Sequence, residues 1–126
     1  MEEKAAVKFV ENRSRFYAHL YEIKDISDAD EIVKLHRRKY RKANHHCYAA
    51  RFMERGGKIK EINKDDGEVG HPGRILLDLL NREKLESHVL IVSRIFGGIK
   101  LGIGGVSRAF REAGEGALEM FHESGS

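Results

Sequence analysis

The order of hydrophobic and polar positions along the chain predicts five strands and three helices. Apolar side chains recur at helical spacing in three stretches, and they alternate or form short continuous runs in five others. The predicted strands are 5–11, 14–23, 45–53, 58–62 and 88–96; the predicted helices are about 27–40, a segment beginning at Pro72, and a closing helix that includes 106–121. This β-β-α-β-β-α-β-α order indicates an α+β fold, a two-layer sandwich with a mixed sheet and its helices on one face.

The segment 88–96 is the most apolar part of the chain. Such a continuous run is typical of a central strand that is covered on both faces. The run is far too short to cross a bilayer, and no pattern of a signal peptide opens the sequence. We therefore expect a single domain over residues 1–126 that is cytoplasmic and has no membrane partner.

A glycine-rich segment, 97–105, separates this strand from the closing helix. Glycine permits positive φ and close approach of a ligand, and the start of a helix offers unpaired N–H groups and a positive dipole end. We therefore predict a phosphate site here. Its predicted members are Arg94, Gly97, Gly98, Lys100, Gly102, Gly104, Gly105, Ser107 and Arg108. Neither the P-loop nor the dinucleotide fingerprint is complete, and the alternative that the glycines only shape a tight turn stays open.

Positive charge is concentrated in one segment, although the net charge of the chain is only +3. No acidic residue interrupts residues 34–46, and this segment carries a cluster of five cations: Arg37, Arg38, Lys39, Arg41 and Lys42. Such a cluster favours a phosphate-bearing partner, so we predict that these residues contact nucleic acid. The alternative is that they close a helix and complement its dipole.

Several polar residues are candidates for a supporting site beside the phosphate. They are His45, Arg51, Asp65, Asp66 and Glu68. The carboxylates have the chemistry of an acid/base pair or of magnesium ligands, and the alternative is a solvated Asp-Gly turn. Cys47 is the only cysteine, which excludes an internal disulfide and a cysteine-based zinc cage. We name no catalytic residue, metal or cofactor, and the sequence leaves the oligomeric state undetermined.

Four sequence blocks resemble the IMPACT/YigZ family over residues 12–118. Their order along the chain is that of the family, and the last block is the most specific. The blocks are Asn-Arg-Ser-Arg-Phe at 12–16, Ala-Asn-His-His-Cys-Tyr-Ala-Ala-Arg at 43–51, Asp-Asp-Gly-Glu at 65–68, and Arg-Ile-Phe-Gly-Gly-Ile-Lys-Leu-Gly-Ile-Gly-Gly at 94–105 with Arg-Ala at 108–109. The segment 69–73 is shorter than the family's pattern, which puts a site built there in doubt.

The resemblance implies a fold and two candidate functions. The implied fold is that of domain IV of elongation factor G, with a left-handed β-α-β crossover. Members of the family often carry a second domain after the final helix, and the eukaryotic namesake regulates translation. We predict a translation-associated regulatory protein that engages RNA, the ribosome or a translation-linked protein through the glycine-rich loop. The alternative is an enzyme that acts on a phosphorylated small molecule or nucleotide at the same loop.

Overall fold

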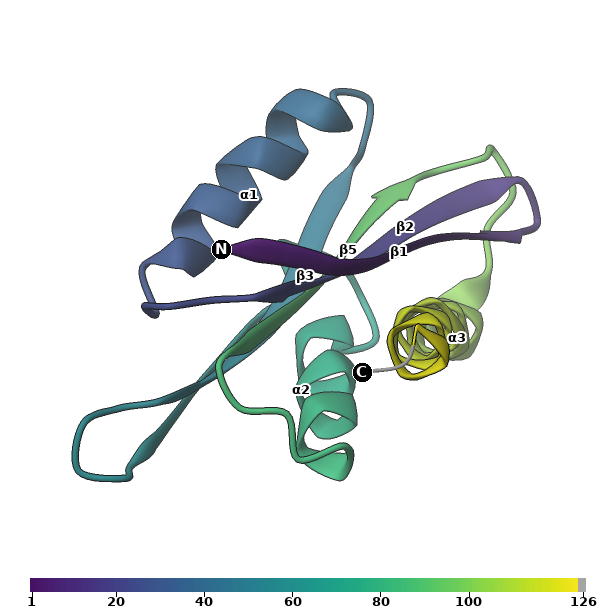
Figure 1. Ribbon diagram of the computed structural model, residues 1–126. Helices are drawn as coiled ribbons and strands as arrows, with labels where there is room; N and C mark the ends of the chain where they lie inside the picture. Colours follow the sequence, from purple (N-terminus) through teal and green to yellow (C-terminus); the bar gives the residue numbers. More distant parts are fainter. Residues whose placement is uncertain (125–126) are drawn as a thin grey trace.

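The computed structural model describes residues 1–124 as one sheet flanked by helices (Figure 1). The predicted order of eight elements is confirmed. The elements are β1 (Glu2–Glu11), β2 (Ser14–Glu22), α1 (Asp28–Lys39), β3 (His45–Met53), β4 (Ile59–Lys64), α2 (Pro72–Arg82), β5 (His88–Ile95) and α3 (Gly102–Glu123). The helix α3 begins at Gly102, inside the segment predicted as a glycine-rich loop. Gly102, Gly104 and Gly105 therefore belong to its first turn.

The sheet has the strand order β1-β2-β5-β3-β4. All neighbouring pairs are antiparallel, so the prediction of a mixed sheet is wrong. The reason is the position of β5, which lies between β2 and β3. The strands that run in the same direction, β2 with β3 and β4 with β5, are each separated by a third strand and do not share hydrogen bonds.

The helices cover both faces of the sheet. Figure 1 shows α1 on one side and α2 with α3 on the other. On the central strand, Val89 and Ile91 pack in the cluster beneath α1, whereas Leu90 and Val92 pack with α2 and α3. The α+β class is confirmed, and the expectation that the helices share one face is corrected. A strand that is apolar at every position needs cover on both sides.

The connections β2–α1–β3 and β4–α2–β5 have opposite hands. They start from strands that run in opposite directions, they move in opposite directions across the sheet, and their helices lie on opposite faces. Each of these three differences alone would reverse the hand of a crossover, and an odd number of reversals leaves it reversed. One of the two crossovers is therefore left-handed. Crossovers between parallel strands are almost always right-handed. The left-handed crossover that the family resemblance implies is therefore confirmed.

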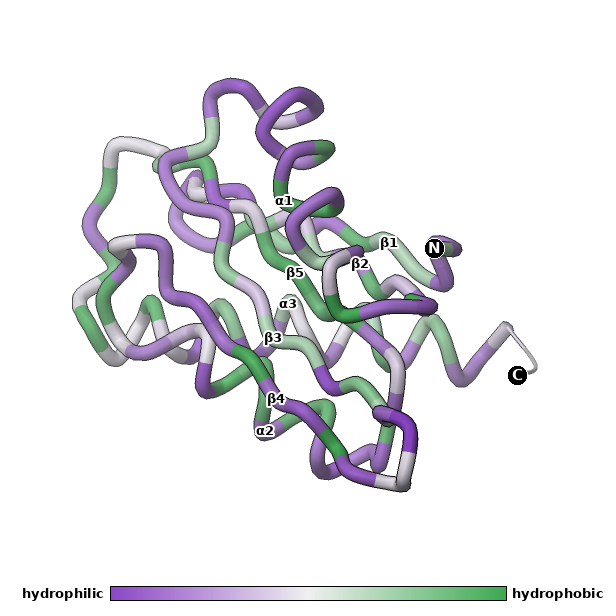
Figure 2. The backbone as a smooth tube through the Cα atoms, turned by 90° about the vertical axis from the view of Figure 1, so that its left-hand side faces the viewer, coloured by the Kyte–Doolittle hydropathy of each residue, from purple (hydrophilic) through white to green (hydrophobic). Residues whose placement is uncertain are grey.

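The two faces of the sheet are stabilised by different interactions. The face under α2 and α3 is apolar and includes Phe16 and Phe110, both without exposed surface. The helix α1 is mostly hydrophilic, as Figure 2 shows, and its buried positions are Ala29, Ile32 and His36. Its contact with the sheet therefore depends on polar side chains as well as on apolar ones.

A hydrogen-bonded network of histidines and hydroxyls attaches the last turns of α1 to the sheet. The two ring nitrogens of His36 hydrogen-bond to the Tyr21 hydroxyl and to Oγ of Ser93, each at 2.9 Å. His46 Nδ1 reaches the same Ser93 Oγ at 2.7 Å. A neutral imidazole has one donor and one acceptor nitrogen, and hydroxyls can match either. Desolvation by burial lowers the pKa of His36 to about 3 and also lowers the pKa of His46.

A second branch of this network reaches the outer strand. His19 hydrogen-bonds through Nε2 to the Tyr40 hydroxyl and through Nδ1 to Glu3 Oε1, both at 2.6 Å. Burial lowers the pKa of His19 even though Glu3 acts in the opposite direction. The same desolvation raises the pKa of Tyr40 to about 12. All three histidines are thus held neutral at the α1 face.

We predict that mild acid destabilises the protein through these histidines. Above pH 6.5 they are neutral in both folded and unfolded states and add no pH dependence. As the pH falls below 6.5, the unfolded chain binds protons that the folded protein excludes. The free energy of unfolding then falls by up to about 1.4 kcal/mol per pH unit for each histidine that stays neutral in the fold, and for His36 this continues down to about pH 3. Urea unfolding followed between about pH 7.5 and 4.5 measures the slope.

Two variants show whether His36 causes the pH dependence of the free energy of unfolding. His36→Gln keeps hydrogen-bonding capacity but cannot titrate, so its stability should depend less steeply on pH below 6.5. His71→Gln is the matched control, because 89% of the His71 side chain is exposed. Equal slopes for wild type and His36→Gln would contradict the prediction.

Candidate functional site

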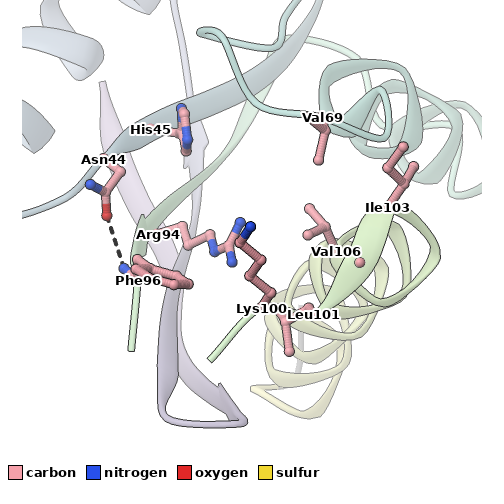
Figure 3. A pocket seen from close by; sticks show the side chains of 10 residues that line it. Asn44, His45, Val69, Arg94, Phe96, Lys100, Leu101, Ile103 and Val106 are labelled. Atoms are coloured by element: carbon pink, nitrogen blue, oxygen red, sulfur yellow. Dashed lines mark hydrogen bonds between the residues drawn. The ribbon is translucent and has the colours of Figure 1, made fainter. Parts of the chain in front are cut away.

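A cavity of about 430 Å³ opens where β5 ends and α3 begins. It lies on the face of the sheet that α2 and α3 cover, next to the start of β3. Its lining residues are Asn44, His45, Val69, Arg94, Phe96, Lys100, Leu101, Gly102, Ile103 and Val106. Arg94 and Lys100 project into the hollow, and Val69, Ile103 and Val106 form the wall across from them (Figure 3). The structure thus brings four predicted site residues together: His45, Arg94, Lys100 and Gly102.

Arg94 is the buried cation of this cavity. It is 6% exposed, and its Nη1 donates a hydrogen bond of 2.8 Å to Oε2 of Glu68, whose side chain is 4% exposed. The guanidinium carbon lies 5.5 Å from the ring centre of Phe16 and 5.8 Å from that of Phe96. The Nε atom is buried and has no hydrogen-bond partner. Arg94 therefore has a countercharge and a buried donor without an acceptor.

The first turn of α3 contributes further donors. Its N-cap residue is Leu101, whose side chain offers no oxygen to the free N–H groups of the helix. Lys100 stands immediately before it and lines the same cavity. Uncapped amides, a positive dipole end and a lysine together favour an anion.

Apolar side chains surround the cavity on the outside. Eight large apolar residues within 1–124 are exposed, and four of them lie in this region. They are Val69, Phe96, Ile99 and Ile103, with exposed fractions between 43% and 66%. Exposed apolar patches around a hollow mark binding sites. The sequence did not reveal this rim, although Ile99 and Ile103 both lie within the glycine-rich segment 97–105.

The glycines of the segment 97–105 have different roles. A Cβ at Gly97 would collide with the backbone of Arg13, so this glycine is needed for packing against the β1–β2 turn. Gly98 and Gly102 have φ values of +88° and +73°, which favour glycine. A Cβ at Gly104 would meet nothing within 4 Å, and one at Gly105 would lie 3.1 Å from Cβ of Leu101.

Six predicted members of the phosphate site do not line the cavity: Gly97, Gly98, Gly104, Gly105, Ser107 and Arg108. Ser107 Oγ donates a hydrogen bond of 2.9 Å to the Gly70 carbonyl, which ties α3 to the loop before α2. Arg108 lies in a different hollow, beside Asn12 and Glu112. Their predicted contact with the ligand stays a prediction that the geometry does not support.

The carboxylates of the turn after β4 have structural partners. Asp65 Oδ1 accepts a hydrogen bond of 2.8 Å from the Gly73 amide at the start of α2. Asp66 Oδ2 accepts one of 2.8 Å from the His46 amide, which fixes the turn to β3. With Glu68 paired to Arg94, all three acidic groups predicted to support the site are engaged within the fold.

Of the remaining polar residues on β3, His45 lies at the cavity and Cys47 is buried in the fold. His45 lines the cavity, with Nδ1 2.9 Å from the Asp66 carbonyl oxygen and Nε2 3.6 Å from Glu68 Oε2. Cys47 is fully buried and donates to the Asp65 carbonyl at 3.1 Å, and burial raises the pKa of its thiol, which disfavours the thiolate form.

Arg51 does not belong to the candidate site. It lies toward the far end of β3, where Nη1 donates to the Leu85 carbonyl at 3.1 Å and Nε to Glu61 at 3.2 Å. Among residues 1–124, no three His, Cys, Asp or Glu side chains are grouped as metal ligands. That part of the chain also contains no helix with the length and hydropathy of a membrane span.

The basic segment lies at the same end of the sheet as the cavity, on the opposite face. Its residues belong to the C-terminal turn of α1 and the loop that leads to Asn44. Arg37, Arg38, Lys39, Arg41 and Lys42 are all exposed. Arg37 also lines a shallow hollow with His46 and Asp66. Basic residues in the last turn also complement the helix dipole, so both interpretations of this segment fit its position.

We predict opposite effects of alanine at two glycines of the segment. Gly97→Ala should lower the free energy of unfolding by about 2 kcal/mol or more, because the backbone of Arg13 cannot move aside cheaply. Gly104→Ala should raise it by about 0.5–1 kcal/mol, because helical glycine is costly and the added methyl group meets open space. Chemical denaturation measures both, and equal effects would contradict the assignment.

We also predict that Glu68→Gln is strongly destabilising. The change leaves the Arg94 guanidinium buried without its countercharge, which should cost about 3–5 kcal/mol. Glu61→Gln is the matched control: its ion pair with Arg51 is more exposed and should cost at most about 1 kcal/mol. Unfolding curves that shift equally for the two variants would contradict the role of the buried pair.

Comparison with known proteins identifies relatives of the chain. Residues 12–118 match the model of the Impact N-terminal domain. The IMPACT family member YvyE of Bacillus subtilis is 32% identical over 103 residues, which are 82% of this chain and 47% of that protein. The chain spans about half the length of the curated relatives it matches.

Solved structures share the fold. A crystal structure of a hypothetical protein superimposes with a TM-score of 0.82 at 28% identity, over 91% of this chain and 56% of that one. A structure described as the two-domain translational regulator Yih1 superimposes with a TM-score of 0.61 at 24% identity, over 96% and 45% of the two chains. The family model covers most of the sequence, including the whole cavity. The chain therefore belongs to the Impact N-terminal domain family.

Proposed function

We propose that this chain is a translation-associated regulatory module that binds RNA of the translation machinery. The family membership and the shared fold of the translational regulator Yih1 support the link to translation. The observation that carries the proposal is the cationic cavity at the start of α3, together with the exposed basic segment at the same end of the sheet.

The charges are arranged as a polyanion requires. The basic segment is solvent-exposed and contains no acidic residue, so its cations are available to phosphates. The loop 40–44 leads from it around the end of the sheet to the cavity, where Lys100 adds a further cation. An RNA strand that follows this path would contact both faces of the domain at one end. Phosphate contacts would supply affinity, and the cavity would supply selectivity.

Binding is favoured over catalysis by the state of the acidic residues. Asp65, Asp66 and Glu68 each hold a structural partner, so none is free to act as a general base beside a phosphate. The proposed module therefore recognises its ligand without transforming it.

Ribosome co-sedimentation at several salt concentrations tests this proposal. Affinity should fall steeply with salt, and the triple variant Arg38→Ala/Arg41→Ala/Lys42→Ala should bind more weakly, with a salt slope shallower by roughly two to three. The matched control removes three exposed cations from the far end of the sheet, at Arg55, Lys58 and Lys60. Binding that ignores salt, or that the two triple variants reduce equally, would contradict RNA recognition at this end and would favour a protein partner.

A further inference from the structure

We infer that the cavity between β5 and α3 binds a single nucleoside 5′-monophosphate unit, either a free nucleotide or an unpaired nucleotide of an RNA. The RNA source rests on the proposed function, and the free nucleotide does not. The inference starts from the Nε atom of Arg94, which is buried and unpartnered beside the cavity. Buried N–H groups almost always have an acceptor, and no group of residues 1–124 provides one for this donor.

The charge of the cavity fits one phosphate group. Glu68 already offsets the charge of Arg94, at 2.8 Å. The positive charge that remains comes from Lys100 and from the uncapped amides of α3. A single phosphate balances these donors, whereas a triphosphate would bring far more negative charge than they offset.

The rest of the lining fits a flat, apolar group. Phe96 is 45% exposed at the cavity and lies beside the Arg94 guanidinium, which makes a planar platform. Ile103 and Val106 stand on the opposite wall (Figure 3). A nucleobase stacks on such an aromatic face and packs against aliphatic side chains, regardless of its sequence identity. Neither inorganic phosphate nor a bare phosphodiester backbone would use this rim.

The size of the cavity sets a limit on the ligand. Its volume of about 430 Å³ lies near the small end of the range for ligand sites, roughly 300–1,000 Å³. This favours one nucleotide over a dinucleotide. The exposed Asn44 and the half-buried His45 at the edge provide polar groups for the sugar.

Titration of the isotope-labelled protein with adenosine 5′-monophosphate, adenosine and inorganic phosphate tests the inference. The monophosphate should shift the amide resonances of residues 98–104 with a dissociation constant of about 1 mM or tighter. Adenosine and phosphate should each bind at least about tenfold more weakly, because each lacks half of the recognised chemistry.

Variants of residues outside the Arg94–Glu68 ion pair localise the binding. Lys100→Ala and Phe96→Ala should each weaken the monophosphate about tenfold, the first by removing charge and the second by removing the stacking platform. Lys58→Ala, at the far hairpin, is the matched control and should change nothing. An unchanged spectrum at millimolar monophosphate, or equal binding of monophosphate and inorganic phosphate, would overturn the inference.

Short RNAs with a 5′-phosphate or a 5′-hydroxyl end separate the two sources. An RNA that shifts the same amides, and loses affinity with Phe96→Ala, identifies an RNA nucleotide as the occupant. If only the free monophosphate binds, the cavity assignment stands and the RNA-binding function fails. If ribosomes bind with the expected salt dependence but no nucleotide shifts these amides, the function stands and the cavity assignment is overturned.

Discussion

The buried ion pair between Arg94 and Glu68 is the interaction on which the functional end of this domain depends. It joins the last residues of the central strand to the turn between β4 and α2, two segments that are far apart in the sequence. Both charges are removed from water, so each needs the other to offset the cost of desolvation. The pair holds Glu68 beneath the cavity and directs Arg94 into it. The pair acts together with the hydrogen bonds of Asp65 and Asp66, which attach the same turn to α2 and β3, and with His45, which lies beside Glu68.

The two faces of the sheet represent two solutions to the same packing problem. Under α2 and α3 the side chains are apolar, and close contact is reached by glycine: a Cβ at Gly114 would lie 2.8 Å from Cδ1 of Leu79. Under α1 the contact includes His36 and Tyr21, whose hydrogen bonds have fixed directions. Apolar packing tolerates small shifts, whereas directional bonds select one position of the helix. The last turns of α1, which carry the basic segment, are therefore held in one orientation.

Sequence periodicity predicted most of the elements but not their arrangement. The unbroken apolar run at 88–96 identified a central strand, and Pro72 marked the start of α2 correctly. The same run implied cover on both faces, yet the side on which α1 packs is decided by tertiary contacts that no local pattern records. The position of β5 between β2 and β3 is likewise a long-range property, and the family resemblance, not periodicity, gave the left-handed crossover.

The candidate site was also predictable only in part, because local sequence patterns do not record contacts between distant residues. The glycines marked the region between β5 and α3, although α3 begins at Gly102, inside the segment predicted as a loop, and charge pointed to Lys100 and Arg94. The sequence did not reveal that Arg94 would be paired with Glu68, because that contact depends on the fold. It also overlooked Ile103, since an apolar residue in a helix is usually buried and this one is 66% exposed. The prediction that Arg51 supports the site was wrong, because Arg51 lies near the end of β3 opposite to His45, far from the cavity.

The strand order also has a consequence for how the protein is made. The hairpins β1–β2 and β3–β4 share no hydrogen bonds with each other, and only β5 connects them. During synthesis, both hairpins and α1 leave the ribosome before residues 88–95 do, and each hairpin then exposes, besides its outer edge, the strand edge that later pairs with β5. The two hairpins must stay apart until β5, in the last third of the chain, is available to pair with both. Completion of the sheet is therefore a late folding event that depends on contacts between residues distant in sequence. A chain of this topology is most exposed to mispairing with its neighbours in the interval before β5 inserts.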